Sequence, residues 1–140
     1  NKKNHKKDST ILLFASINDS CDAKENQKKK KKEGVMNSYI SVSMENGLKI
    51  LSESKNAVLL DVRRIDEYKA GHIPESILFT NETMTQEKAE KLIPSKDTKI
   101  FVYCRSGRRS KEASKKLIEY GYKNVVEIGG ILDYSGKLEN

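Results

Sequence analysis

The chain has 140 residues, of which 36% are hydrophobic, enough to supply one compact core but hardly two. Its net charge of +7 lies mostly in residues 1–37, which hold ten Lys against five acidic residues, whereas residues 38–140 hold seventeen Lys or Arg against fifteen. Two cysteines, Cys21 and Cys104, exclude a disulfide framework and a zinc site built from cysteines. We therefore expect a disordered basic tail over residues 1–37 and one domain over residues 38–140.

The tail has the order of a secretory signal, with a basic start, an apolar run over residues 11–17 and a cysteine, Cys21. This order resembles a bacterial lipoprotein leader, in which the cysteine carries lipid. The basic segment that follows is typical of a spacer beside anionic lipid headgroups. We expect an extracytoplasmic protein tethered to a membrane surface, with a soluble extension on a cytoplasmic protein as the alternative. Basic residues without interleaved aromatic residues argue against a nucleic-acid partner.

The first half of the domain alternates between strands and helices. Ser43 can cap a helix, and Gly71 is typical of a residue that ends one. A continuous apolar run is expected for a strand covered on both faces. In chain order, the predicted elements are a strand at residues 39–43, a helix at 44–53, a strand at 57–62, a short helix within 63–74 and a strand at 76–79.

The second half repeats this alternation. Thr83 or Thr85 can cap a helix that turns Ala89, Leu92 and Ile93 inward. The predicted elements are a helix at residues 85–93, a strand at 99–104, a helix at 110–122 and a strand at 124–128. Strands separated by helices require right-handed crossovers. The fold class is therefore α/β, a three-layer domain with a mainly parallel central sheet of about five strands and helices on both faces.

Cys104 ends a predicted buried strand and opens the loop CRSGRRS. Ligands collect beyond the carboxyl ends of parallel strands, so a site is expected at this position. Gly107 permits a turn whose backbone amides face the sulfur, and the next helix adds its positive end. Arg105, Arg108 and Arg109 add positive charge, which favours the thiolate form of Cys104. An inert packing cysteine is the alternative, and Arg108 fits an ordinary surface residue equally well.

Three motifs in the domain resemble the rhodanese family of sulfurtransferases. CRSGRRS is similar to the active-site loop of that family, LLDVRRIDEYKAGHIPES to its first signature and VVEIGG to its closing one. The resemblance spans roughly residues 39–135 and implies a rhodanese-like domain. The tryptophans usual after the double glycine are absent, and Ile131 and Tyr134 stand in that region.

The resemblance implies a thiosulfate sulfurtransferase that works through a persulfide on Cys104. Thiosulfate is the small anionic donor, cyanide or a thiol or protein is the acceptor, no metal or other cofactor is required, and a monomer is expected. Asp61 and Arg63 either hold the loop or fix the turn in which they lie. The substrate-binding residues implied are Arg105, Ser106, Gly107, Arg108, Arg109 and Ser110.

Three other functions remain open. A sulfur carrier would hand the persulfide to a protein partner, and its loop would look the same. A tyrosine phosphatase is disfavoured because it needs arginine six positions after the cysteine, where this chain has Ser110. A rhodanese-fold phosphatase or arsenate reductase is disfavoured because such phosphatases use a loop one residue longer than the one here. A non-catalytic binding module is disfavoured because most such domains of the family have lost the cysteine that is retained here.

Overall fold

The computed structural model describes residues 38–140. The expected tail, its leader and Cys21 therefore lie outside the described residues. Within residues 38–140, none of the helices has the length and apolar character needed to cross a membrane.

Five parallel strands form one sheet in the order β1-β5-β4-β2-β3. Their bounds are β1 Ile40–Ser41, β2 Ala57–Asp61, β3 Ile77–Leu78, β4 Lys99–Cys104 and β5 Asn124–Gly130. The apolar runs form the three central strands, β5, β4 and β2, because each needs cover on both faces. The predicted α/β class, parallel sheet and strand number are confirmed.

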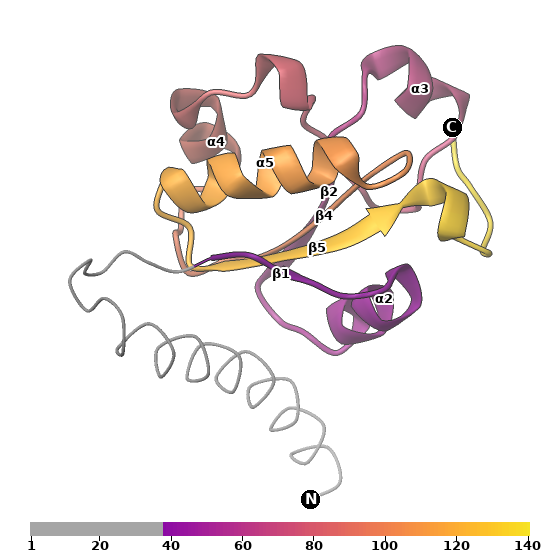
Figure 1. The fold of residues 1–140 in the computed structure, drawn as a ribbon, viewed down its shortest axis with the longest axis horizontal. Coiled ribbons are helices and arrows are strands. Elements are labelled where there is room, and N and C mark those ends of the chain that lie inside the picture. The colour runs from indigo at the N-terminus through magenta and orange to yellow at the C-terminus, as the bar shows by residue number, and fades with distance from the viewer. Residues whose placement is uncertain (1–37) are drawn as a thin grey trace, which may run out of the picture.

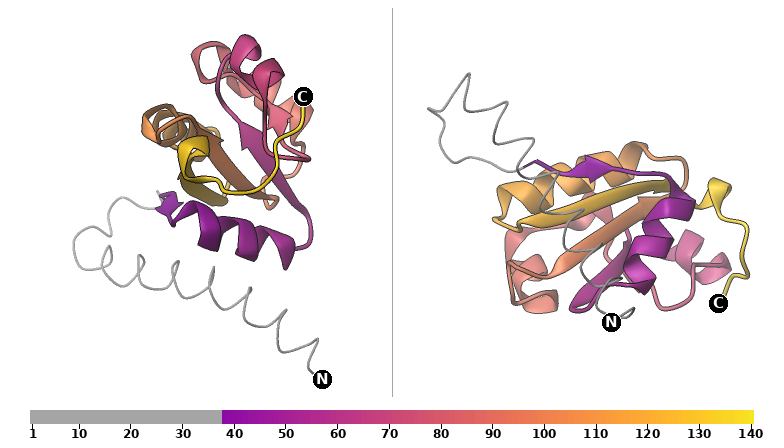
Figure 2. Two further views of the ribbon diagram at one scale, coloured as in Figure 1. Left: turned by 90° about the vertical axis from the view of Figure 1, so that its right-hand side faces the viewer. Right: turned by 90° about the horizontal axis from the view of Figure 1, so that it is seen from below.

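Helices cover both faces of the sheet, as Figures 1 and 2 show. Helices α4 and α5 lie on one face, α2 lies on the other, and α3 lies near the carboxyl ends of the strands. One core cluster packs beneath α4 and α5 and a second beneath α2. The bounds are α2 Met44–Ser52, α3 Ile65–Ala70, α4 Gln86–Leu92 and α5 Arg108–Glu119, with short 3-10 turns η2 Asn81–Thr83 and η3 Ile131–Asp133.

Helix starts follow the expected capping chemistry. The Ser43 hydroxyl accepts a hydrogen bond from Asn46 N at 3.1 Å, and Thr85 rather than Thr83 caps α4, accepting from Lys88 N at 3.1 Å. The prediction that Leu92 turns inward is wrong, since this side chain is 39% exposed. Helix α4 is only seven residues long, and such a short helix buries a narrow stripe.

The carboxyl ends of β4 and β5 bring the two glycine-containing motifs together. Cys104, the last residue of β4, pairs with Gly130, the last residue of β5, after a register shift that follows Val102. The loop after Cys104 therefore starts against the double glycine. This edge of the sheet is where the sequence placed a site.

Candidate active site

Cys104 is a free thiol at the carboxyl edge of the sheet, and it is only 1% exposed. The backbone N–H of Gly107 donates a hydrogen bond to its Sγ at 3.0 Å. Gly107 has φ of 113°, in the region that favours glycine, and helix α5 begins directly after it. The loop therefore directs an amide and the positive end of a 12-residue helix at the sulfur, an arrangement that stabilises negative charge there.

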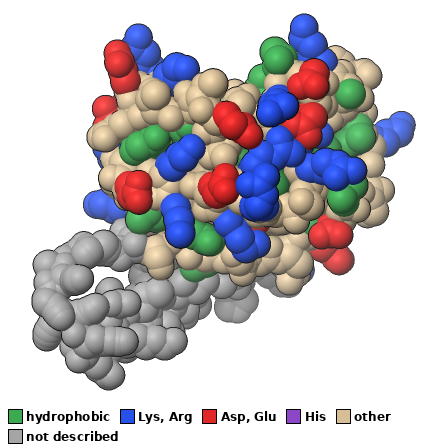
Figure 3. Space-filling model, turned by 45° about the horizontal axis from the view of Figure 1, so that its top comes forward, with side chains coloured by type: hydrophobic (Ala, Val, Ile, Leu, Met, Phe, Trp, Pro, Cys, Tyr) green, Lys and Arg blue, Asp and Glu red, His purple; other side chains and the backbone are tan. Residues whose placement is uncertain are grey.

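A hollow of 400 Å³ is lined by the two residues that follow Cys104 and by side chains from α3, η2 and the start of α5. Figure 3 shows Lys and Arg side chains gathered on the face that α4 and α5 help to cover, with acidic side chains among them. The lining residues are Arg64, Asp66, Glu67, Glu82, Arg105, Ser106, Arg108 and Arg109.

Arg109, one of the arginines expected to attract the donor, is already paired. Its guanidinium donates to both carboxylate oxygens of Glu67 in α3, at 2.8 and 3.0 Å. These hydrogen bonds from Arg109 lower the pKa of Glu67 from 4.5 to about 2, and the hydrogen bond to Glu67 raises the pKa of Arg109. The pair ties α3 to α5 and offsets part of the positive charge at the hollow.

The other two arginines that follow Cys104 in the chain, Arg105 and Arg108, are more exposed. The Arg108 side chain is 75% exposed and forms a surface ion pair with Glu112 at 3.2 Å. Arg105 is exposed and lines the hollow. The structure therefore offers Arg105 and Arg108, together with the backbone of the loop, to an incoming anion.

Ser110 lies in the first turn of α5, and its side chain turns into the interior. It is fully buried, and its Oγ donates to Glu127 Oε2 at 2.6 Å. Any contact of Ser110 with substrate is therefore left to its backbone. The sequence interpretation assigned no role to Glu127 or to Glu67. A charged residue inside the apolar run VVEI was the available signal for Glu127.

The double glycine lets the backbone of the cysteine loop lie directly against β5. A Cβ on Gly130 would overlap the carbonyl group of Arg105. That carbonyl also accepts a hydrogen bond from Leu132 N at 3.2 Å. The closing motif thus needs glycine at this position because the backbone of the cysteine loop occupies the space a side chain would fill.

Asp61 is the last residue of β2 and Arg63 lies in the turn that follows, where the two side chains form an ion pair. Arg63 donates to both oxygens of Asp61, at 2.7 to 3.1 Å, and to the carbonyl of Gly71 at 2.8 Å. Tyr103 lies beside them, and burial together with a hydrogen bond to Asp61 raises the pKa of its phenol. Of the two roles expected for Asp61 and Arg63, these contacts fit fixing the turn.

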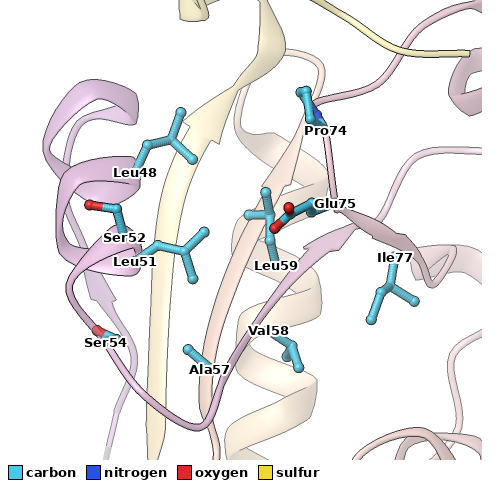
Figure 4. Close-up of a pocket in the computed structure, with 10 residues that line it drawn as sticks. All are labelled: Leu48, Leu51, Ser52, Ser54, Ala57, Val58, Leu59, Pro74, Glu75 and Ile77. Carbon is cyan, nitrogen blue, oxygen red and sulfur yellow. The ribbon is translucent and has the colours of Figure 1, made fainter.

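A second hollow, of 440 Å³, lies between α2 and the β2–β3 edge of the sheet. In Figure 4, Leu48 and Leu51 of α2 face it from one side and Ile77 from the other. None of the predicted site residues lines it. Within residues 38–140, no group of three or more His, Cys, Asp or Glu residues is placed to hold a metal ion.

The parallel sheet and the cysteine loop at its carboxyl edge define a sulfurtransferase-type α/β domain. Residues 44–137 match the family model described as the rhodanese-like domain, so the chain belongs to the rhodanese-like family. The crystal structure of a thiosulfate sulfurtransferase from Pseudomonas aeruginosa aligns with a TM-score of 0.63 and 27% identity, over 73% of this chain and 20% of that one.

Curated relatives match over part of their length. The chain is 34% identical over 89 residues to a tRNA uridine(34) hydroxylase of Sodalis glossinidius, covering 61% of this chain and 25% of the relative. It is 30% identical over 99 residues to the putative sulfur carrier protein YrkF of Bacillus subtilis, covering 70% of this chain and 52% of the relative. The chain thus spans between a quarter and about half of these relatives.

Proposed function

We propose that this protein is a thiosulfate sulfurtransferase that carries sulfane sulfur as a persulfide on Cys104. The observation that carries the proposal is the hydrogen bond from Gly107 N to Cys104 Sγ, 3.0 Å long, at the start of α5. A hydrogen bond from a backbone amide stabilises a negatively charged sulfur much more than a neutral thiol. The arginine-lined hollow beside it supplies a route for an anionic donor.

In the first step, the Cys104 thiolate attacks the outer sulfur of thiosulfate. A new sulfur–sulfur bond forms, the bond within thiosulfate breaks, and sulfite leaves with the electron pair. The enzyme persulfide keeps one negative charge, which Gly107 N–H can stabilise as it stabilises the thiolate. In the second step, cyanide or a thiolate takes the outer sulfur and restores the Cys104 thiolate.

Positive charge at the hollow favours binding of an anionic donor and departure of sulfite as the leaving group. Arg105 and Arg108 are exposed there, and each can donate several hydrogen bonds to sulfonate oxygens. Ser110 occupies the position where a tyrosine phosphatase needs arginine, and its hydroxyl is engaged by Glu127. Phosphate chemistry therefore lacks its clamp in this loop.

A carrier that passes the persulfide to a protein partner is the second candidate function. The similarity to the putative sulfur carrier YrkF supports it. A carrier would take up sulfur from thiosulfate but release it slowly to small acceptors. Tethering of the domain to a membrane surface through residues 1–37 remains part of the proposal, and lipid labelling of Cys21 would test it.

The test is the rate of thiocyanate release from thiosulfate and cyanide. Replacement of the nucleophile in Cys104→Ser should lower turnover by about a thousandfold or more. Cys21→Ser, which changes the other cysteine of the chain, is the matched control and should keep the activity of the unchanged protein. Turnover that persists in Cys104→Ser, or is absent from the unchanged protein, would overturn the enzyme proposal.

A further inference from the structure

The proposed chemistry leaves Glu127 of β5 without a role. Its side chain is buried, with 1% of the residue exposed, and its neighbours in the strand on both sides, Val126 and Ile128, are apolar. Removing a carboxylate from water is costly unless hydrogen bonds and a counter-charge replace the water. The partners of Glu127 therefore indicate what this residue does.

Three donors and one cation surround the carboxylate. Oε2 accepts hydrogen bonds from Ser110 Oγ at 2.6 Å and from Gly129 N at 2.8 Å. Oε1 accepts from Ser41 Oγ at 2.8 Å, and Lys111 Nζ lies 3.6 Å from it. These partners come from β1, from the first turn of α5 and from the double glycine. Glu127 thus joins three segments at the base of the cysteine loop.

The contact with Ser110 connects the carboxylate to the sulfur. The Ser110 Oγ–H is also directed at the carbonyl oxygen of Gly107, 2.9 Å away, so its single proton is shared between Glu127 Oε2 and Gly107 O. The N–H of Gly107 is the group that donates to Cys104 Sγ. A Cβ added to Gly107 would lie 4.0 Å from Glu127 Oε2, so the two residues are neighbours. A short path therefore runs from Glu127 through Ser110 and Gly107 to Cys104.

The charge of Glu127 does not explain its presence. A carboxylate behind a loop that holds a sulfur anion opposes that anion, and Lys111 offsets only part of the effect. What the carboxylate provides is a fixed geometry, because a charge-assisted hydrogen bond of 2.6 Å holds the Ser110 side chain in one orientation.

We propose that Glu127 is a positioning residue that, through Ser110, holds Gly107 N–H on Cys104 Sγ. The expected changes in kcat rest on the proposed sulfur transfer. The expected effect on the position of the Gly107 amide does not. Through Ser41, the same carboxylate connects the strand β1 to the catalytic loop.

Two serines on α5 provide a matched comparison. Ser110 and Ser114 are both fully buried, but within the described residues the Ser114 hydroxyl has no hydrogen-bond partner. Ser110→Ala should lower kcat for thiosulfate turnover about tenfold with KM changed less than about twofold, whereas Ser114→Ala should leave both within about twofold. The arginines of the hollow are untouched in both variants, which is why KM is preserved.

Two substitutions of Glu127 separate geometry from charge. Glu127→Gln can keep an oxygen at the Oε2 position, so kcat should stay within about threefold of the unchanged value. Glu127→Leu removes every acceptor and should lower kcat about tenfold or more. If Glu127→Leu does not fold, the two serine variants decide the question.

Hydrogen exchange at the Gly107 amide, measured by NMR, reports how firmly this N–H is held in its hydrogen bond to Cys104 Sγ. The measurement does not depend on sulfur transfer. Exchange should be at least about tenfold faster in Ser110→Ala than in Ser114→Ala, because the hydrogen bond to Sγ is loosened. Unchanged exchange would overturn the positioning role, whatever the kinetics. If the unchanged protein transfers no sulfur but exchange is still faster in Ser110→Ala, the positioning role of Glu127 is supported and the proposed function is wrong.

Discussion

Replacing Glu67 with Gln should destabilise the domain near neutral pH by about 1–2 kcal/mol. Arg109 donates to both oxygens of the Glu67 carboxylate, and the two side chains are 15% and 25% exposed. The hydrogen bonds from Arg109 lower the pKa of Glu67 from 4.5 to about 2, which corresponds to at most about 3 kcal/mol of stability. A quarter of the Glu67 side chain meets water, and solvent screening reduces that upper value.

The pH dependence of this effect has a defined sign. Because the pKa of Glu67 in the folded state lies below its unfolded value of 4.5, the stabilisation is complete above that pH and is lost as the pH falls toward 2. Urea unfolding of the unchanged protein and Glu67→Gln should therefore show a stability difference that falls below half of its neutral value by about pH 3.

A difference that stays constant between neutral and acidic pH, or that is absent at neutral pH, would show that the ion pair between Arg109 and Glu67 does not stabilise the folded domain. Asp66→Asn is the control, because it removes an exposed carboxylate from the same helix, α3. Its stability should remain within about 0.5 kcal/mol of the unchanged protein at neutral pH.

Three further substitutions follow from the contacts of single residues. Gly130→Ala places a Cβ against the carbonyl of Arg105, so it should abolish thiocyanate release and lower stability by about 1–3 kcal/mol. Normal turnover would show that the Arg105 carbonyl does not need the space at Gly130. Arg105→Ala should raise KM for thiosulfate about tenfold with a smaller change in kcat, and an unchanged KM would remove this residue from donor binding. Tyr103→Phe removes the acceptor of the Ile73 N–H and should cost about 1–3 kcal/mol in urea unfolding. The exposed hydroxyl of Tyr134 is the comparison, and equal costs for the two Tyr→Phe changes would contradict the assignment.

Much of the fold could be predicted because local pattern and burial agree. The apolar runs at β2 and β4 are covered on both faces, as continuous runs predict, and the cap at Ser43 follows from side-chain chemistry alone. The prediction that Leu92 is buried was wrong because periodicity identifies the apolar face of a helix but not how much of that face other elements cover. How much of each helix is covered depends on tertiary packing.

The candidate site was predicted only where sequence neighbours build it. Cys104, Gly107 and the start of α5 are adjacent in the chain, so their arrangement follows from one strand, one turn and one helix. The pairs Arg109–Glu67 and Ser110–Glu127 join residues that are distant in sequence. Their partners depend on which loops the sheet order brings together, and residue types alone do not specify that order.

Persulfide formation on Cys104 is measured by the intact mass of the protein after exposure to thiosulfate. We expect a gain of one sulfur atom, about 32 Da, that cyanide removes. The gain should appear in the unchanged protein and in Cys21→Ser and should be missing from Cys104→Ser. A protein that gains no sulfur, or a Cys104→Ser variant that still gains it, would contradict persulfide chemistry at Cys104.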